Sequence, residues 1–297
     1  MNLKELEYLV AIDEERHFHR AAARCFVSQP TLSGQLKKLE EELGILLVDR
    51  TNRQVTMTEA GSAVALQARE VLTGAKKIRE IAQSFEDPLA GEMQLGLIPT
   101  VAPYLLPVIM PLFKKHFPNL KFWLHEYQTR VLLEKLRRAE LDLLILALPV
   151  ETDEFTEQSL FDEPFWLAMS REDPMTKKKQ IELRDLTSRE MLLLEEGHCL
   201  RGQALDVCFM AGASEDQTFH ATSLETLRHM VGEGMGMTLL PELAVPKNKS
   251  EAENVQYRPF KAPPPVRHIG MLYRTGSYRE EAFLAIARAI QSHFKSV

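Results

Sequence analysis

The stretch VSQPTLSGQLKKLEEELG, residues 27–44, contains the start, the buried face and the end of one amphipathic helix. Ser28 is a typical N-cap, and Pro30 fits the first turn, where its missing N–H does no harm. Gly44 is a typical residue to end a helix. Between them, leucines recur at helical spacing at Leu32, Leu36, Leu39 and Leu43. The stretch therefore predicts a helix that buries its leucine face and exposes a polar face.

The segments on either side of this helix predict a small DNA-reading fold. Two shorter apolar patterns at helical spacing precede it, in residues 3–12 and 19–26, and two helices joined by a tight turn form a helix-turn-helix. Residues 46–58, LLVDRTNRQVTMT, indicate two short strands around a polar tip. We therefore interpret residues 1–58 as a winged helix-turn-helix domain.

The polar face of the helix in residues 27–44 predicts contacts with DNA. Neutral side chains there suit base edges in the major groove, and basic side chains on the helix and the wing suit phosphates or the minor groove. The predicted DNA-binding residues are Gln29, Pro30, Thr31, Ser33, Gln35, Lys38, Arg50 and Arg53. An ordinary solvated helix face remains the alternative, because residues 1–58 carry slightly more acidic than basic side chains.

The composition is that of an ordinary globular protein, with 45% apolar and 26% charged residues. The net charge of −6 argues against a protein that coats nucleic acid generally, but it allows a local basic face. Three cysteines are no disulfide framework, which predicts a reducing, cytoplasmic environment. The sequence has neither a signal-peptide pattern at its start nor an apolar run of about 20 residues, so we expect no membrane association.

Residues 59–87 predict one long helix with a seven-residue repeat. Val64, Val71, Ile78 and Phe85 are spaced by seven, and alanines follow four residues after the first three. Such a repeat favours a linker helix that pairs with a second copy of the chain. A helix packed on its own chain is the alternative.

The remaining chain alternates strand patterns with helix patterns. The expected strands are residues 93–99, 120–126, 141–148, 190–196 and 268–274, and the expected helices are residues 101–117, 130–139, 223–234 and 279–294. This alternation predicts a largely parallel sheet covered by helices, arranged as two doubly wound subdomains around a cleft. We place subdomain I at about residues 88–162 and 268–297, and subdomain II at about residues 163–267.

Two threonines in this region each follow a strand and precede a helix. Thr100 and Thr129 are therefore placed where a hydroxyl can face the predicted cleft. Position alone fits a plain helix cap at least as well.

Residues 194–209, LEEGHCLRGQALDVCF, contain two of the three cysteines. Cys199 directly follows His198, which disfavours a shared metal ion, and nothing in the sequence supports a Cys/His pair for acyl transfer. Buried structural thiols are an alternative for both cysteines, and Cys25 fits that description well. Cys199, however, begins an apparent helix close to Arg201, and both features lower the pKa of a thiol.

A reactive Cys199 thiolate predicts a redox switch. Peroxide oxidises an accessible thiolate to a sulfenic acid, and Cys208 is then a candidate to condense with it. Nine residues of helix rise by about 13.5 Å, whereas a disulfide requires Cα atoms roughly 4.4–6.8 Å apart. Disulfide formation would therefore require this segment to unwind.

Specific segments resemble a known family. FHRAAARCFVSQPTLSGQLKKLEEELG with DRTNRQVTMTEAG resembles the reading head of LysR-type transcriptional regulators. LIPTVAPYLLP, LILAL, LFDEP, LEEGHCLRGQA and ATSLETLRHMV resemble the hydrogen-peroxide-sensing members of that family. The resemblance covers nearly the whole chain. It implies a redox-sensing effector domain in residues 88–297, with two subdomains like those of periplasmic binding proteins.

The resemblance also implies roles for individual residues. Cys199 would be the peroxidatic thiol and Cys208 the resolving thiol, and Ser33 and Arg50 match DNA-contact positions. The residues implied to bind peroxide are Thr100, Thr129, His198 and Arg267. The family implies a transcriptional activator without cofactor or metal, not an enzyme.

The implied partners are inverted-repeat promoter DNA, RNA polymerase and a cellular thiol reductant of the glutaredoxin or thioredoxin type. A homodimer and a homotetramer are the implied assemblies. Two alternatives remain: a LysR-type regulator that binds a small metabolite and has structural cysteines, and a thiol peroxidase enzyme.

Overall fold

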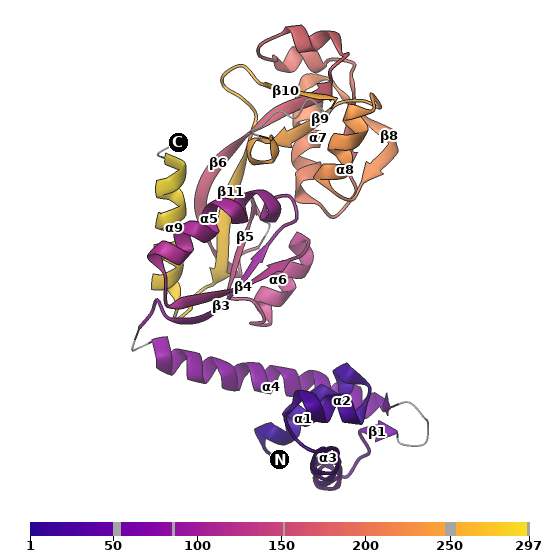
Figure 1. Ribbon diagram of the computed structural model, residues 1–297, viewed down its shortest axis with the longest axis vertical. Helices are drawn as coiled ribbons and strands as arrows, with labels where there is room; N and C mark the ends of the chain where they lie inside the picture. Colours follow the sequence, from indigo (N-terminus) through magenta and orange to yellow (C-terminus); the bar gives the residue numbers. More distant parts are fainter. Residues whose placement is uncertain (50–54, 85–86, 151, 247–253, 296–297) are drawn as a thin grey trace. The chain divides into compact units, whose positions relative to one another are not determined.

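The computed structural model describes residues 1–49, 55–84, 87–150, 152–246 and 254–295. The chain forms two units, Met1–Glu86 and Asp87–Val297, and each is described by itself (Figure 1). Among the described helices, none combines the length and the apolar character that crossing a membrane requires.

The first unit, termed the reading unit, is the predicted winged helix-turn-helix. Its helices are α1 (Leu3–Glu15), α2 (Phe18–Arg24), α3 (Gln29–Leu43) and α4 (Glu59–Ser84). The wing strands β1 (Val48–Asp49) and β2 (Thr56–Met57) pair antiparallel. Helix α3 begins and ends as predicted, because the Ser28 side chain accepts the N–H of Thr31 and Gly44 adopts a left-handed conformation with φ 71°. The wing tip, with Arg50 and Arg53, lies outside the described residues.

The start of α4 packs tightly on the wing. The Thr58 hydroxyl accepts the Gly61 N–H at 2.8 Å, which caps the helix, and donates to the Leu46 carbonyl at 2.8 Å. A Cβ at Gly61 would lie 1.9 Å from the Leu47 carbonyl oxygen, so only glycine fits this approach. The close contact joins α4 directly to the core of the reading unit.

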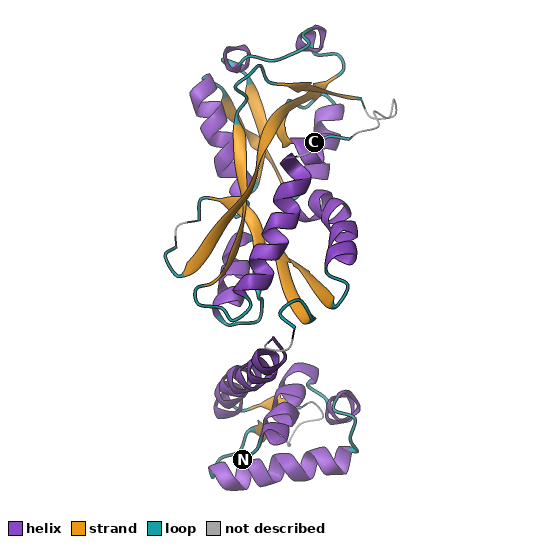
Figure 2. Cartoon of the chain, turned by 90° about the vertical axis from the view of Figure 1, so that its left-hand side faces the viewer, coloured by secondary structure: helices purple, strands orange, loops and turns teal. Residues whose placement is uncertain are grey.

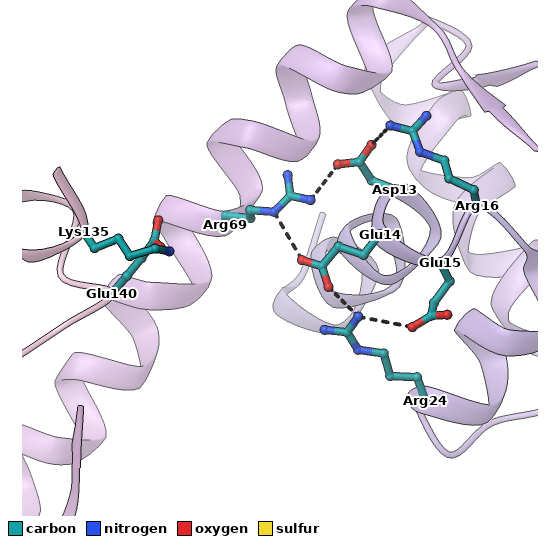
Figure 3. Close-up of polar contacts among 8 residues, drawn as sticks. All are labelled: Asp13, Glu14, Glu15, Arg16, Arg24, Arg69, Lys135 and Glu140. Atoms are coloured by element: carbon teal, nitrogen blue, oxygen red, sulfur yellow. Dashed lines mark hydrogen bonds and ion pairs between the residues drawn. The ribbon is translucent and has the colours of Figure 1, made fainter. Parts of the chain in front are cut away.

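Ion pairs hold α1 against α4 (Figure 3). Arg69 of α4 donates to Asp13 at 2.6 Å and to Glu14 at 3.4 Å. Arg24 of α2 also pairs with Glu14. Exposed pairs of this kind each contribute only about 0–1 kcal/mol, so their main effect is to fix how the three helices are oriented.

The predicted repeat on α4 divides into two parts. Val64 and Ala68 pack toward the core of the reading unit, whereas Val71 and Ile78 remain 43% and 70% exposed. An apolar row that is uncovered within one chain is compatible with pairing of two copies, which stays a prediction.

The second unit combines a sheet with helices on both sides (Figure 2). Its strands are β3 (Gly91–Leu97), β4 (Leu120–Glu126), β5 (Leu143–Leu148), β6 (Phe155–Ser170), β7 (Glu190–Leu194), β8 (Ser214–Ala221), β9 (Thr238–Pro241), β10 (Val255–Pro259) and β11 (Val266–Arg274). Its helices are α5 (Ala102–His116), α6 (Thr129–Arg137), α7 (Cys199–Ala211), α8 (Leu224–Gly232) and α9 (Glu280–Lys295), with short 3-10 helices η1 (Pro174–Lys177), η2 (Leu183–Leu186) and η3 (Glu242–Ala244).

The main sheet is mixed, so the predicted parallel pairing holds only for β3 with β4 and β5, and for β7 with β8, which form a separate two-stranded sheet. The strand order is β10-β6-β11-β5-β3-β4, with β9 also paired to β6. Strand β3 is parallel to β4 and β5, but β11 is antiparallel to both β5 and β6. The long strand β6 and the returning strand β11 reverse the chain direction at the centre of the sheet.

The second unit contains two hydrophobic cores that share strand β6. Along β6, Leu160 packs in the first core and Phe165 in the second. The first core also takes the fully buried strand β5, whose apolar run is typical of a strand covered on both faces. Strand β6, with β11 paired along it, therefore connects the two halves of this unit.

We predict that Gly61→Ala destabilises the reading unit, because the added methyl group meets the Leu47 carbonyl. Forced overpacking of this kind costs about 2 kcal/mol. In the full-length chain, amide hydrogen exchange in the first turns of α4 should accelerate by roughly thirtyfold.

The matched control for this variant is Gly74→Ala in the same helix, where nothing lies within 4 Å of the added Cβ. That variant should be stabilised by up to about 1 kcal/mol. Equal exchange rates in the two variants would contradict the close contact.

Candidate functional site

A sharp turn delivers Cys199 to the first turn of α7. Gly197 has φ 96°, and His198, in extended conformation, is the N-cap residue. A Cβ at Gly197 would lie 2.8 Å from Oε1 of Gln128. The backbone angle therefore favours glycine here, whereas the Gln128 side chain could move aside. The turn leaves the Cys199 side chain half-buried.

The surroundings of Cys199 act on its thiol in opposite directions. Burial raises the pKa of the Cys199 thiol, whereas the Arg267 charge, the Thr129 hydroxyl and the backbone of Leu200 and Ala147 lower this pKa. Burial is the largest influence, so the pKa lies above its ordinary value. The sequence-based expectation of a lowered pKa is therefore wrong in direction.

The cation expected beside Cys199 was also assigned wrongly. Nη2 of Arg201 lies 2.8 Å from each carboxylate oxygen of Glu215 on β8, and this pairing directs its charge to that strand. Arg267, from the distant strand β11, is the cation that acts on Cys199. Arg201, close to Cys199 in sequence, is thus engaged with another strand, whereas Arg267, far from Cys199 in sequence, acts on its thiol.

Arg267 is almost completely buried and is held by polar contacts with Glu163 and Thr100. Its Nε donates to Oε2 of Glu163 at 2.8 Å, its Nη1 to the Thr100 hydroxyl at 3.2 Å, and its Nη2 to the Thr100 carbonyl at 3.0 Å. Glu163 on β6 lies directly opposite Arg267 in the antiparallel ladder. Glu163 was missed by the sequence analysis, because no local pattern reveals a partner on another strand.

The two predicted threonines do not cap helices. Val101 and Gln128 occupy the N-cap positions of α5 and α6, and neither makes a side-chain cap. The Thr100 oxygen accepts from Arg267, which leaves its own hydroxyl proton for another acceptor. The Thr129 hydroxyl oxygen is buried and has no hydrogen-bond partner of good geometry among the described residues. Both hydroxyls are therefore available to a small polar ligand.

A cavity of about 380 Å³ opens between the two halves of this unit. Two of the predicted residues, Thr100 and His198, line it. The other lining residues are Pro99, Pro103, Tyr104, Glu126, Gln128, Leu194, Glu195, Thr222, Ser223, Leu224 and Glu225. Thr129 and Arg267 instead act at the thiol of Cys199, the residue that follows His198. Thr100 and His198 thus lie in the cavity wall, whereas Thr129 and Arg267 surround the Cys199 thiol.

Cys208 lies on the same helix as Cys199, as predicted for residues 199–209. Both thiols are free, and Cys208 is buried. Burial and the charge of Glu215 raise the pKa of the Cys208 thiol to about 11. Because α7 is continuous between the two cysteines, their Cα atoms are separated by a helical rise of about 13.5 Å.

Within the described ranges, no group of three or more His, Cys, Asp or Glu side chains could hold a metal ion.

Six of the predicted DNA-binding residues lie on α3. Gln29, Pro30, Thr31 and Lys38 are exposed, and Ser33 and Gln35 are half-buried. The Thr31 hydroxyl pairs with Ser28 at 2.8 Å, and Lys38 lies 3.2 Å from the buried Glu5. The first turn of α3 therefore presents an accessible polar face.

Comparisons with known proteins agree with this arrangement. Residues 3–62 match the model of the bacterial regulatory helix-turn-helix protein, lysR family, and residues 86–295 match the LysR substrate binding domain. The chain is 49% identical to the DNA-binding transcriptional dual regulator OxyR of Escherichia coli K12, over 100% of this chain and 98% of that protein. It is 47% identical to the hydrogen peroxide-inducible genes activator of Haemophilus influenzae, with the same coverage.

Solved structures are similar as well. A full-length OxyR from Pseudomonas aeruginosa with a cysteine-to-aspartate substitution is 39% identical and covers 98% of this chain and 95% of its own, with a TM-score of 0.71. The reduced form of an OxyR is 44% identical and covers 69% of this chain and 97% of its own, with a TM-score of 0.64. The resemblance predicted from the sequence is thereby confirmed, and the chain belongs to the LysR family of bacterial helix-turn-helix regulators.

Proposed function

We propose that this chain is a DNA-binding transcriptional activator that senses hydrogen peroxide through Cys199 and Cys208. The observation that carries the proposal is the set of donors at Cys199: the buried Arg267 guanidinium and the Thr129 hydroxyl both act on this one thiol. The names of the similar proteins from E. coli and H. influenzae, OxyR and peroxide-inducible activator, support the same conclusion.

The proposed reaction begins at the sulfur of Cys199. The thiolate attacks one peroxide oxygen, the O–O bond breaks, and Cys199 becomes a sulfenic acid. The second oxygen leaves with a proton as water. Arg267, Thr100 and Thr129 can donate hydrogen bonds to the peroxide oxygens as negative charge moves onto the leaving oxygen. His198, in the wall of the adjacent cavity, would orient the incoming peroxide.

The second step links the two cysteines. The Cys208 sulfur attacks the sulfenic sulfur, an S–S bond forms and water leaves. A disulfide cannot form across nine residues of intact helix, so α7 has to unwind and Cys208 has to leave its buried position. The Arg201–Glu215 ion pair, which joins α7 to β8, has to be broken during this change. Reduction by a glutaredoxin-type or thioredoxin-type thiol would restore the helix.

The DNA-binding part of the proposal rests on the reading unit. The exposed residues of α3, together with Arg50 and Arg53, would contact inverted-repeat promoter half-sites. The uncovered apolar row of α4 supports a homodimer, and two dimers would form the homotetramer. The refolded α7 would change how subunits pack, and so change contacts with promoter DNA and RNA polymerase. The chain would act in the cytoplasm.

Two other functions remain open to test. The cavity beside Thr100 and His198 favours a regulator that binds a small metabolite, for which the cysteines would be structural. A thiol peroxidase would turn over many peroxide molecules when a reductant is supplied. A sensor would react about once in each reduction cycle.

We expect brief, low-dose peroxide to produce a Cys199–Cys208 disulfide that dithiothreitol reverses. Peptide mapping by mass spectrometry with trapped thiols measures it, and Cys25 serves as the internal control that stays free. Two free thiols after treatment would support the metabolite-binding alternative. Identical operator footprints of the reduced and oxidised protein would contradict the proposed change in DNA contacts.

We expect the reactivity of Cys199 to rise with pH. Burial raises the pKa of the Cys199 thiol, so the thiolate fraction at pH 7 is below that of a free cysteine. Below this pKa, the alkylation rate by iodoacetamide should increase about tenfold per pH unit. Thr129→Val removes a donor that lowers this pKa and should move the profile to higher pH. Thr156→Val, at a half-buried position on β6 that is not among the groups acting on Cys199, should not. A rate that is already constant below pH 7 would contradict the raised pKa.

We expect Glu215→Gln to speed disulfide formation, because it breaks the ion pair between α7 and β8 and removes a charge that raises the pKa of Cys208. At a fixed, limiting dose of peroxide, the yield of disulfide should rise several-fold relative to trapped sulfenic acid. Glu190→Gln, an exposed change on β7, is the control. An unchanged ratio in Glu215→Gln would show that this ion pair does not limit the unwinding of α7.

A further inference from the structure

Glu163 is a buried carboxylate at the place where the two halves of the second unit meet. It is 2% exposed and lies on β6 between Leu160 of the first hydrophobic core and Phe165 of the second. Its partner in the antiparallel ladder is Arg267. A charged residue at this depth requires a specific reason, because burial of a charge is costly unless the charge is paired.

Both oxygens of Glu163 are used. Oε2 accepts from Nε of Arg267 at 2.8 Å and lies 2.8 Å from its Nη2, and Oε1 accepts the backbone N–H of Leu243 at 2.9 Å. The Leu243 contact ties the carboxylate to η3, which fixes its orientation. The carboxylate therefore presents one defined edge to the guanidinium.

The guanidinium in turn has little freedom. Its Nε and Nη2 face Glu163, while Nη1 and Nη2 reach the hydroxyl and carbonyl of Thr100. An arginine carries five N–H donors, two of them on Nη1. The Arg267 charge acts on the Cys199 thiol.

We propose that Glu163 is a positioning residue for the peroxide reaction, which holds the Arg267 guanidinium against Thr100 and beside the Cys199 sulfur. The proposal rests on the proposed function in that it assigns Cys199 as the reacting thiol. Glu163 acts through Arg267 and does not contact the reacting atoms.

The alternative is that Glu163 merely cancels the Arg267 charge. In that case its removal would strengthen the positive field at Cys199 and lower the pKa of the thiol. The Leu243 N–H fixes one oxygen of Glu163 while the other accepts from the guanidinium, so the geometry favours positioning. The two possibilities predict opposite changes in reactivity.

Glu163→Gln is the sharpest variant. A glutamine has a single acceptor oxygen, so it cannot accept from both Leu243 and Arg267, and its NH₂ group would face a donor. The expected result is that the iodoacetamide profile of Cys199 moves to higher pH and that alkylation and peroxide oxidation at pH 7 slow by about tenfold or more. Glu157→Gln, an exposed change on the same strand, should leave both rates within twofold of the original chain.

A double-mutant cycle with Arg267→Met distinguishes an effect of Glu163 through Arg267 from a general loosening of the structure around Cys199. If Glu163 acts through Arg267, Glu163→Gln should change the Cys199 alkylation rate by less than twofold when Arg267→Met is already present. An unchanged or accelerated rate in the single Glu163→Gln variant would overturn the proposal. A further slowing in the Arg267→Met background would overturn it as well.

Glu163→Asp provides a second test if the glutamine variant does not fold by circular dichroism. It keeps the charge but shortens the side chain by one methylene group, so the same slowing should appear with smaller size. A rate equal to that of the original chain would again overturn the proposal. Alkylation requires no response to peroxide, so this test remains decisive even if the original chain forms no disulfide.

Discussion

The arrangement around Cys199 depends on burying a positive charge where two hydrophobic cores meet. A lone guanidinium at this depth would be strongly unfavourable, and removing one partner of a buried ion pair typically costs about 3–5 kcal/mol. Arg267 is tolerated because Glu163 lies opposite it on the neighbouring strand and Thr100 accepts two further hydrogen bonds. Strands β6 and β11 therefore do more than join the two halves of the unit: their pairing places a cation next to a half-buried thiol.

The opposing influences on Cys199 explain how one thiol can be both protected and reactive. Burial disfavours the thiolate and so restricts reaction with bulky or poorly fitting oxidants. The donors nearby favour the thiolate and the charge that develops on a leaving oxygen. A small oxidant that fits among these donors gains from them, whereas a larger one meets only the cost of burial.

The sequence predicted those features that depend on local signals. Helix α3 has its cap, leucine face and terminal glycine within one short stretch, and the apolar run of β5 was found for the same reason. Strand β6 was missed because its sequence, FTEQSLFDEPFWLAMS, mixes acids and a proline with apolar residues and is buried only in part. The antiparallel return of β11 was missed because strand direction is decided by pairing, which no local pattern records.

The candidate site was predicted in part, for similar reasons. The resemblance to peroxide-sensing regulators named Thr100, Thr129 and Arg267, which the structure does bring to the thiol or to its neighbours. Reasoning from neighbouring residues alone chose Arg201, which turns away to Glu215. Glu163 could be found only from the structure, because its significance lies in a partner across the sheet.

The ion pairs of Arg69 with Asp13 and Glu14 have a mechanical consequence. They join α4 to α1 in the half of α4 that Gly61 also holds against the wing, so α4 is fixed to its neighbours at two places. A helix of 26 residues is about 39 Å long. Tilting such a rod by about ten degrees displaces its far end by roughly 7 Å, which is the length of about two base pairs of DNA. A small rotation at one end of α4 therefore displaces its other end by a distance comparable to the spacing of base pairs.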